Sequence, residues 1–392
     1  MTFEIVTTRN CNLQCKYCFE GKKQSILMPT SMIPMLLHFI EDFRKKEFIS
    51  DNSSVHIDFN GGETLLNLMF IKQFLKTAEN FKFNYSFTTN GILINDEIIN
   101  LINKYDIFLQ ISLDGNQKTH DYNRVYYDGT GSFDDVLKKL KLLQSKCKKD
   151  MFQIATVVTP ETVQSFAENF DFFIANGFTK ITVVGCSDYL WTDNNYDEFE
   201  KQLHIIGDNY IKSFENNIFI DFSLFNKNID NSLDGLIKRK CDAINGEIAI
   251  LPDGNILPCG GFVGCQNEKN FYIGNIFTSI DENKIKLFLS QSLKIKNESC
   301  KECNLFNRCQ NDCFALNNRI NKNILIPDES SCRINQIAIK ESDRILAHFM
   351  TTKNKCFFEH NKNILERLEK KIKMKENKKT SLFNYIMNKK FT

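Results

Sequence analysis

Three cysteines near the start of the chain constrain it more than any other feature. Cys11, Cys15 and Cys18 follow a short apolar run, 3–7, that predicts a β-strand. A C-x3-C-x2-C loop after a strand presents three thiolates to one face of an iron–sulfur cube and leaves the fourth iron without a protein ligand. A zinc knuckle is the alternative, but structural zinc requires four protein ligands, and no His or fourth Cys lies nearby. The loop therefore predicts a cluster with an open iron.

Strand-like apolar runs continue along the first half of the chain and alternate with amphipathic stretches. Five runs follow the cysteine loop, at 55–59, 85–89, 108–113, 153–158 and 181–185. Helical patterns lie at 32–45 and 133–146, with Ser31 and Ser132 as the expected N-caps. Six strands alternating with helices predict a parallel sheet in an α/β fold. In such folds the site lies at the C-terminal ends of the strands.

The cysteine spacing, with Tyr17 before the third cysteine, resembles the signature of the radical S-adenosylmethionine (SAM) superfamily. The resemblance implies a partial (β/α)6 TIM barrel, in which the open iron chelates the amino and carboxylate groups of SAM. Tyr17 then belongs to the cofactor-binding residues. An electron entering the cluster would cleave SAM reductively and give a 5'-deoxyadenosyl radical, which abstracts hydrogen from the substrate.

Further expected SAM contacts lie where strands end. Gly61, Gly62 and Glu63 look like the family's GGE motif, which holds the amino group of SAM, and paired glycines allow a close approach of the backbone. Ser112 and Arg124 are the expected clamp for the SAM carboxylate and ribose, because Arg grips a carboxylate through a planar fork of donors. The alternative for Arg124 is an ion pair with Asp121 at a helix end.

A second group of cysteines follows in the later part of the chain, with Gly254 between its first two members: Cys241, Cys259, Cys300, Cys303, Cys309, Cys313 and Cys332. Its pattern resembles the SPASM extension, an auxiliary-cluster domain of peptide-modifying radical SAM enzymes, over 236–335. A zinc ribbon is the competing interpretation of paired CxxC elements. The resemblance implies two auxiliary [4Fe–4S] clusters, and hence three cubes per chain. The distal one would be held by Cys300, Cys303, Cys309 and Cys332, and the proximal one by Cys241, Cys259 and Cys313.

The proximal set lacks a fourth thiolate, because some relatives place one a few residues before Cys241 and this chain has none there. We expect Cys265, six residues after Cys259, to complete the cluster, since Gly260, Gly261 and Gly264 make the loop between them supple. The alternative is an open iron that coordinates a substrate thiolate, because soft thiolates are natural ligands of these clusters.

The resemblance implies an oxidoreductase that installs a thioether or carbon–carbon crosslink in a ribosomally made peptide. The main alternative is an anaerobic sulfatase maturase, which forms formylglycine. Those enzymes carry a carboxylate directly after the residue corresponding to Cys259, where this chain has Gly260. A peptide epimerase is a further alternative. An electron-transfer or zinc-binding module is the non-enzymatic one, but a pure carrier ligates all four irons and needs no SAM clamp. No residue is singled out as a catalytic base.

The expected partners are a precursor peptide with leader and core and a flavodoxin or ferredoxin. Because the first strand starts almost at residue 1, we expect the leader to be bound by a separate leader-recognition protein, by the C-terminal tail or by the barrel itself. A net charge of +2 argues against a nucleic-acid partner. No apolar run approaches the length that spans a bilayer, which argues against a membrane partner. With no secretory signal before the first strand, the thiols indicate a reducing cytoplasm.

We expect a barrel over 1–230, the auxiliary-cluster domain over 236–335, and a C-terminal helix with a basic tail over 336–392. The tail is either a fraying solvated helix or a docking surface for a partner. Among the remaining cysteines, Cys147 and Cys356 are expected to be small buried hydrophobes. Cys186, at the end of the sixth strand, is the one placed to face a substrate.

Overall fold

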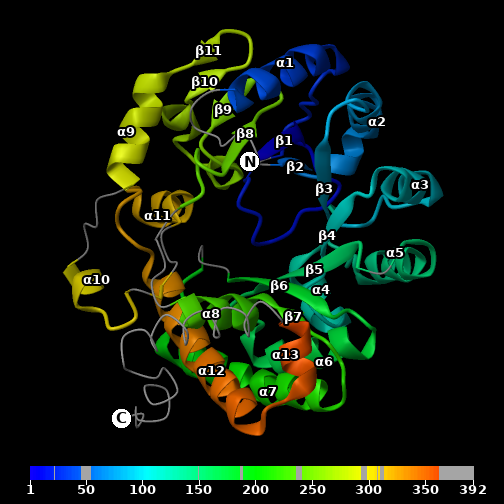
Figure 1. Cartoon of the computed structure of the whole chain (residues 1–392). Coiled ribbons are helices and arrows are strands. Elements are labelled where there is room, and N and C mark those ends of the chain that lie inside the picture. The colour runs from blue at the N-terminus through cyan, green and yellow to red at the C-terminus, as the bar shows by residue number, and fades with distance from the viewer. Residues whose placement is uncertain are drawn as a thin grey trace, which may run out of the picture.

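Six parallel strands form the first half of the chain (Figure 1). The computed structural model describes residues 1–21, 23–45, 54–148, 150–185, 189–234, 241–292, 298–306, 308–309 and 313–361. The strands pair in chain order, each parallel to the next. The six predicted strands are confirmed, and their bounds are β1 Thr2–Thr8, β2 Val55–Gly61, β3 Phe83–Thr89, β4 Phe108–Ser112, β5 Phe152–Val158 and β6 Lys180–Gly185.

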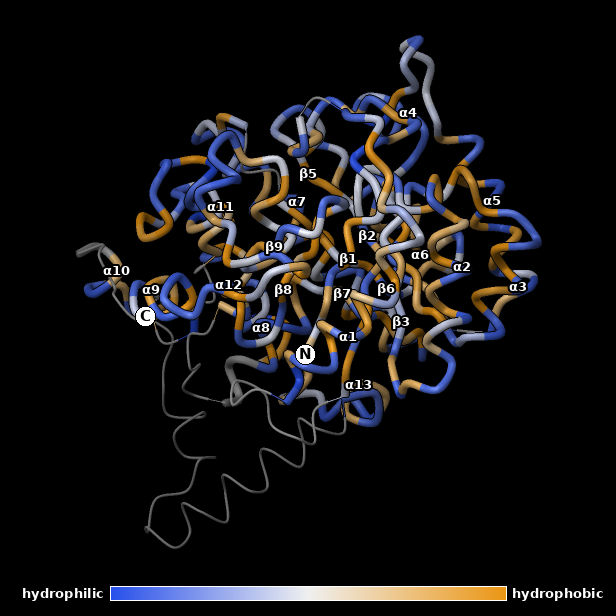
Figure 2. The backbone as a smooth tube through the Cα atoms, turned by 90° about the horizontal axis from the view of Figure 1, so that it is seen from above, coloured by the Kyte–Doolittle hydropathy of each residue, from blue (hydrophilic) through white to orange (hydrophobic). Residues whose placement is uncertain are grey.

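Helices cover the outer face of these strands and bury apolar side chains against them (Figure 1). Phe59 of β2 packs edge-on against Phe74 of α2, with ring centroids 5.4 Å apart, and against Phe87 of β3 at 5.6 Å. Hydrophilic turns mark the outer edges of α3 and α5 (Figure 2). The helices here are α1 Ile33–Arg44, α2 Leu68–Thr77, α3 Asp96–Tyr105, α4 Gln117–Asn123, α5 Phe133–Lys146, α6 Phe166–Ala175 and α7 Asp193–Glu215, with 3-10 turns η1 Thr30–Met32, η2 Thr64–Asn67 and η3 Val163–Ser165.

Ser31 does not cap α1, and Ser132 occupies the N-cap position of α5 without a side-chain capping hydrogen bond. Ser31 lies inside η1, and α1 starts after Met32, without a side-chain cap. Ser132 does precede α5, but its hydroxyl donates to the Arg124 carbonyl at 2.8 Å, and the free Phe133 amide donates to Asp121 instead. At Ser132 a tertiary contact outweighs the local capping preference.

Four further strands extend the same sheet beyond β1, which the sequence patterns did not predict. β8 (Glu247–Ile250) pairs parallel with β1, and antiparallel pairs add β9 (Asn255–Leu257), β10 (Gly274–Asn275) and β11 (Ser279–Ile280). Gly254 makes the turn from β8 to β9 with a φ of +83°, a left-handed conformation that favours glycine. At the other edge, β7 (Asp221–Phe222) pairs with β6. The barrel is therefore open, with the cysteine-rich region attached at its β1 edge.

The chain then returns to the opposite edge of the barrel. Helix α12 packs along α7 and α8, next to β6 and β7 (Figure 1). In Figure 1 the start of α12 lies beneath α11. The remaining elements are α8 Ser223–Asp234, α9 Glu282–Ser292, α10 Glu298–Glu302, α11 Phe314–Asn321, α12 Glu329–Thr352, α13 Lys355–His360, η4 Gly260–Phe262 and η5 Glu268–Phe271.

Candidate functional site

The first cysteine loop leaves the C-terminal end of β1 and is held by the segment that follows α4. The amides of Gln14 and Lys16 donate to the carbonyls of Val125 and Asn123, at 2.8 and 2.9 Å. The loop cannot move independently of that segment, and the segment carries Arg124. The barrel thus fixes the three cysteines and the predicted SAM clamp as one unit.

The three thiols of this loop have different electrostatic surroundings. Burial raises the pKa of Cys11 to about 12, and burial also raises the pKa of Cys15, against the opposing charge of Arg124. Lys23 donates to the Cys18 sulfur at 2.9 Å and lies 3.6 Å from Glu20. Two cations therefore face this loop, which suits a site that must hold thiolates.

The two glycines after β2 pack directly against the cysteine loop. A Cβ on Gly61, whose φ is +141°, would lie 2.3 Å from the Thr8 carbonyl oxygen. A Cβ on Gly62 would lie 2.3 Å from the Asn10 carbonyl oxygen and 3.2 Å from Cys11 Cβ. These positions require glycine because the backbones of two strand ends meet there. Their predicted contact with SAM stays a prediction.

Glu63 is buried, and its carboxylate is engaged within the chain. It accepts hydrogen bonds from the Thr89 hydroxyl and the Asn90 amide, both at 2.7 Å, and from the Leu65 amide at 3.1 Å. Burial raises the pKa of Glu63, and these donors oppose the rise. These bonds join the ends of β2 and β3, and the predicted contact of Glu63 with SAM stays a prediction.

Arg124 pairs with Asp114, a residue that the sequence analysis did not select. Arg124 Nε lies 3.1 Å from Asp114 Oδ1, and both side chains are buried. The Tyr17 hydroxyl donates to Asp114 Oδ2 at 2.6 Å, and the guanidinium lies 5.2 Å from the Tyr17 ring centroid. Asp121 instead binds the start of α5, so the alternative pairing of Arg124 with Asp121 is wrong. The signal available in the sequence was an acid two residues after β4.

Asp114 therefore orients the guanidinium and leaves its remaining donors for another anion. Asp114 raises the pKa of Arg124, against the opposing effect of burial, so the side chain remains a cation. Ser112, the other member of the predicted clamp, ends β4 with a half-buried side chain. Whether Ser112 and Arg124 hold SAM stays a prediction.

Two groups of the later cysteines are electrostatic neighbours, with the same members as the two sets that the family resemblance implies. Burial and the neighbouring Glu247, Cys241 and Cys313 raise the pKa of the Cys259 thiol. The second group surrounds Cys332 at the start of α12, where burial and, more weakly, the other three thiols of the group raise the Cys332 pKa, against a hydrogen bond from Gln336. Those three are Cys300, Cys303 and Cys309.

Electrostatic proximity does not establish ligation. Among the described residues, no three His, Cys, Asp or Glu side chains converge closely enough to hold a single metal ion. All the cysteine ligand roles, including those of Cys11, Cys15 and Cys18, therefore stay predictions.

Cys265 lies after η4, half-buried, with its sulfur 3.9 Å from the Gly261 carbonyl oxygen. Gly261 also neighbours Cys259, whose sulfur lies 3.4 Å from where a Gly261 Cβ would be. Cys259 and Cys265 thus flank the same glycine. The role of Cys265 as fourth ligand remains a prediction.

A pair of carboxyl groups next to Cys259, one buried (Glu4) and one half-buried (Glu247), is a second feature that the sequence analysis missed. Glu4, on the inner face of β1, hydrogen-bonds with Glu247, and burial together with Glu247 raises the pKa of Glu4 well above its usual value. A Cβ on Gly260 would collide with the Glu4 carboxyl group, and the Gly260 amide donates to Glu247 at 3.2 Å. The signal was a single acid in an otherwise apolar strand, 3–6.

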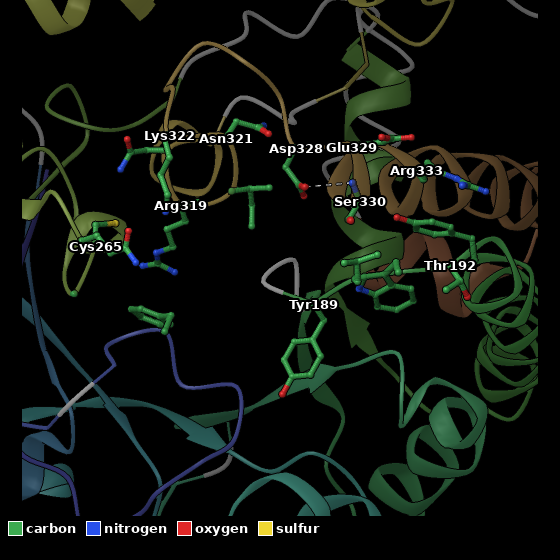
Figure 3. Close-up of a pocket in the computed structure, with 18 of the residues that line it drawn as sticks. Tyr189, Thr192, Cys265, Arg319, Asn321, Lys322, Asp328, Glu329, Ser330 and Arg333 are labelled. Atoms are coloured by element: carbon green, nitrogen blue, oxygen red, sulfur yellow. Dashed lines mark hydrogen bonds between the residues drawn. The ribbon is translucent and has the colours of Figure 1, made fainter.

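A cavity of about 920 Å³ opens between Phe19, the segment 264–267 that follows η4, the end of α11 and the N-termini of α7 and α12 (Figure 3). Cys265 and Arg319 lie on one wall, and Tyr189 and Thr192 lie across from them. Trp191, the single tryptophan of the chain, also lines it. Its size suits a segment of peptide.

Some sequence predictions concern residues without a described structure or without a described role. Cys186 and the tail from 362 onward lie outside the described residues. Cys356 is buried and Cys147 is half-buried, which agrees with their expected packing roles. In the part of the chain that the structure describes, no helix is long and apolar enough to cross a membrane.

Comparisons with known proteins show which families and folds the chain resembles. Residues 5–173 match the radical SAM superfamily. The chain is 28% identical over 327 residues to a cysteine-type anaerobic sulfatase-maturating enzyme of Clostridium novyi, an alignment covering 78% of this chain and 85% of that protein. It is 26% identical over 364 residues to the radical SAM cyclopropyl synthase TigE of Paramaledivibacter caminithermalis, covering 86% of this chain and 72% of TigE.

Two solved structures share the fold. The sulfatase-maturating enzyme anSMEcpe, solved with AdoMet and the Cp18Cys peptide, superposes with a TM-score of 0.74 at 22% identity, covering 90% of this chain and 99% of that one. SuiB of Streptococcus suis, bound to its precursor peptide SuiA, gives a TM-score of 0.59 at 21% identity, covering 84% of this chain and 75% of SuiB. At these identities the likeness establishes the fold.

Proposed function

Because this chain carries a radical SAM domain over residues 5–173, we propose that it is a radical SAM enzyme that crosslinks a ribosomally made peptide. The observation that carries the proposal is the cavity of Figure 3, which Phe19, the residue after Cys18, and Cys265 both line, and which is large enough for a peptide segment. The sulfatase-maturating enzymes, TigE and SuiB support a peptide or protein substrate.

The residues at the end of β1 fit a cluster with one open iron. Cys11, Cys15 and Cys18 would hold three irons, and Lys23 and Arg124 provide nearby positive charge. When bound there, the cluster and SAM supply an electron and a carbon radical that abstracts hydrogen. Flavodoxin or ferredoxin is the proposed electron donor, and a reducing cytoplasm is the proposed compartment.

The chain's own residues bind and orient the cofactor in this proposal. Arg124 offers its free donors to the SAM carboxylate, and Asp114 with Tyr17 holds the guanidinium in place. Ser112 lies at the adjacent strand end. The backbone at Gly61 and Gly62 packs against the cysteine loop, and this segment would hold the amino group of SAM.

The two later groups of cysteines are proposed to hold auxiliary clusters, which gives three per chain. Cys300, Cys303, Cys309 and Cys332 supply the four thiolates of the distal cluster. Cys241, Cys259 and Cys313 supply three for the proximal cluster, and Cys265 is proposed as the fourth because it flanks the same glycine as Cys259.

One observation favours the sulfatase maturase as a second candidate. The sequence lacks a carboxylate at position 260, which argued against this activity. In the structure, however, the Glu4 carboxyl group occupies the place that a side chain at position 260 would take. The space next to Cys259 therefore does contain an acid, Glu4. The lack of a carboxylate at position 260 no longer distinguishes a sulfatase maturase from a crosslinking enzyme.

Mass spectrometry of candidate peptides distinguishes these functions. The reconstituted enzyme is incubated anaerobically with SAM, dithionite and, in parallel, the short peptides and the sulfatase peptides encoded in the same genome. A crosslinking enzyme removes a pair of hydrogens from a precursor peptide and joins two of its residues. Formylglycine in a sulfatase peptide supports the second candidate instead. If SAM is cleaved and no peptide changes mass, the peptide-crosslinking proposal is wrong.

A further inference from the structure

Three cations line the cavity of Figure 3, and two of them are already engaged. Arg333 Nη1 lies 2.5 Å from Asp193 Oδ1, and its guanidinium stacks 3.8 Å above the Tyr196 ring centroid. Lys322 donates to the Arg319 carbonyl at 2.9 Å and projects from the exposed end of α11. Arg333 is therefore neutralised, and Lys322 is held at the rim.

Arg319 is the third cation, and it is oriented without being neutralised. Its guanidinium carbon lies 3.9 Å above the Phe19 ring centroid, and Nη2 donates to the Gly261 carbonyl at 2.5 Å. Both contacts are with uncharged groups. Among the described residues, no carboxylate lies within ion-pair distance of Arg319, and most of its five N–H groups have no acceptor.

The acids of the cavity are not available to Arg319. Asp193 pairs with Arg333, and Asp328 accepts from the Ser330 and Ser331 amides at the start of α12. Glu329 is exposed in the first turn of the same helix, across the cavity from Arg319 (Figure 3). A preoriented, unpaired guanidinium in a peptide-sized cavity is a binding site for an anion.

We propose that Arg319 binds an acidic side chain of the substrate peptide, so that the substrates carry an Asp or Glu at a fixed place relative to the modified residue. This inference rests on the proposed function and adds the chemical class of its substrate. Leu190, 91% exposed at the cavity edge, and Phe19 offer apolar contact to the residues that flank the acid. A charged hydrogen bond of this kind changes affinity about tenfold to a hundredfold.

A random peptide library tests the inference because it presents acidic and neutral residues at every peptide position. The reconstituted holoenzyme with SAM is panned against displayed random dodecapeptides, in parallel with Arg319→Gln, Arg319→Lys and Arg333→Gln. Arg333→Gln is the matched control, because it removes a cavity cation that Asp193 already neutralises. For selected peptides, the affinity of the acidic form and of its amide counterpart is measured from the fluorescence of Trp191.

We expect an acidic residue at one position of the peptides bound by the wild type, Arg319→Lys and Arg333→Gln, and its loss in Arg319→Gln. We expect the amide counterpart to bind the wild type about tenfold to a hundredfold more weakly. Absence of acidic enrichment in the wild type, or the same enrichment in Arg319→Gln, overturns the inference. If Arg319→Gln does not fold, Arg319→Lys provides the test. Loss of the acidic enrichment in a folded Arg319→Lys, which keeps the positive charge, also overturns the inference. If no peptide is enriched, both this inference and the proposed action on a peptide are contradicted. Cleavage of SAM by the wild type tests the radical chemistry of the proposed function separately.

Discussion

Replacing Gly62 by alanine is expected to displace the first cysteine loop. The new Cβ would lie 2.3 Å from the Asn10 carbonyl oxygen and 2.8 Å from its carbon, whereas ordinary contact starts at 3.4 Å. The loop backbone must therefore retreat by about 1 Å. Two hydrogen bonds oppose that movement, from the Glu63 amide to Asn10 at 2.8 Å and from the Gly62 amide to Thr8 at 3.1 Å.

The size of the effect follows from these contacts. Overpacking costs about 1 to 3 kcal/mol, and losing one of the backbone hydrogen bonds adds about 1 kcal/mol. We expect Gly62→Ala to lower the free energy of unfolding by about 2 to 4 kcal/mol. We also expect it to deplete iron at the first site, because Cys11 Cβ lies 3.2 Å from the added methyl group.

Iron content and anaerobic urea unfolding measure the two effects together. Gly185→Ala is the control, because its Cβ would meet only the end of the Ile334 side chain at an ordinary 3.4 Å. The control should retain both the iron and the unfolding midpoint of the wild type. If Gly62→Ala also retains both, the close packing of β2 against the cysteine loop does not position the cluster, and the reasoning is refuted.

Four further predictions follow from the described contacts. Arg124→Ala should weaken SAM binding, measured by equilibrium dialysis, about tenfold to a hundredfold. It should also lower the free energy of unfolding by about 3 to 5 kcal/mol, because Asp114 is left buried without its cation. Unchanged values of both would show that Arg124 has neither role. Burial raises the pKa of Asp58 to about 6 in the folded state, so the protonated carboxyl group stabilises the fold fully below about pH 4, and this stabilisation is lost as the pH rises through 6. Urea unfolding should therefore show a smaller loss of stability between pH 5 and pH 7.5 for Asp58→Asn than for the wild type. Glu268→Gln should lower the unfolding free energy by about 1.5 to 3 kcal/mol, because Glu268 accepts two 2.9 Å bonds from Arg9, and an unchanged urea midpoint would show that the pair contributes nothing. Cys265→Ala should lose iron relative to the wild type by colorimetric assay; full iron content and activity would indicate an open proximal cluster instead.

The sequence predicted the barrel because its strands are apolar runs with a strong local signal. The runs 55–59 and 153–158 lie within β2 and β5 and extend over most of their length. The strands β8–β11 escaped prediction because they are only two to four residues long, and they form by pairing with β1 and with each other. Such pairing depends on contacts that no local pattern encodes.

Site residues were likewise predicted where their role depends on local sequence and missed where it depends on distant partners. Cysteines and glycines at fixed spacing were visible in the sequence, because their roles depend on local backbone geometry. Asp114 and Glu4 were missed, because their roles depend on Arg124 and Glu247, which lie 10 and 243 residues away along the chain. The function of a buried acid is defined by the partner that the fold brings to it, as Arg319 and its uncharged neighbours also show.

Formation of 5'-deoxyadenosine by the reconstituted protein tests the central claim most directly. The wild type, given SAM and dithionite without oxygen, should contain about twelve irons and cleave SAM. Replacement of Cys11, Cys15 and Cys18 by alanine should remove about four irons and abolish cleavage, while the later cysteines keep theirs. Purified protein with stoichiometric zinc, no iron and no 5'-deoxyadenosine would contradict the account.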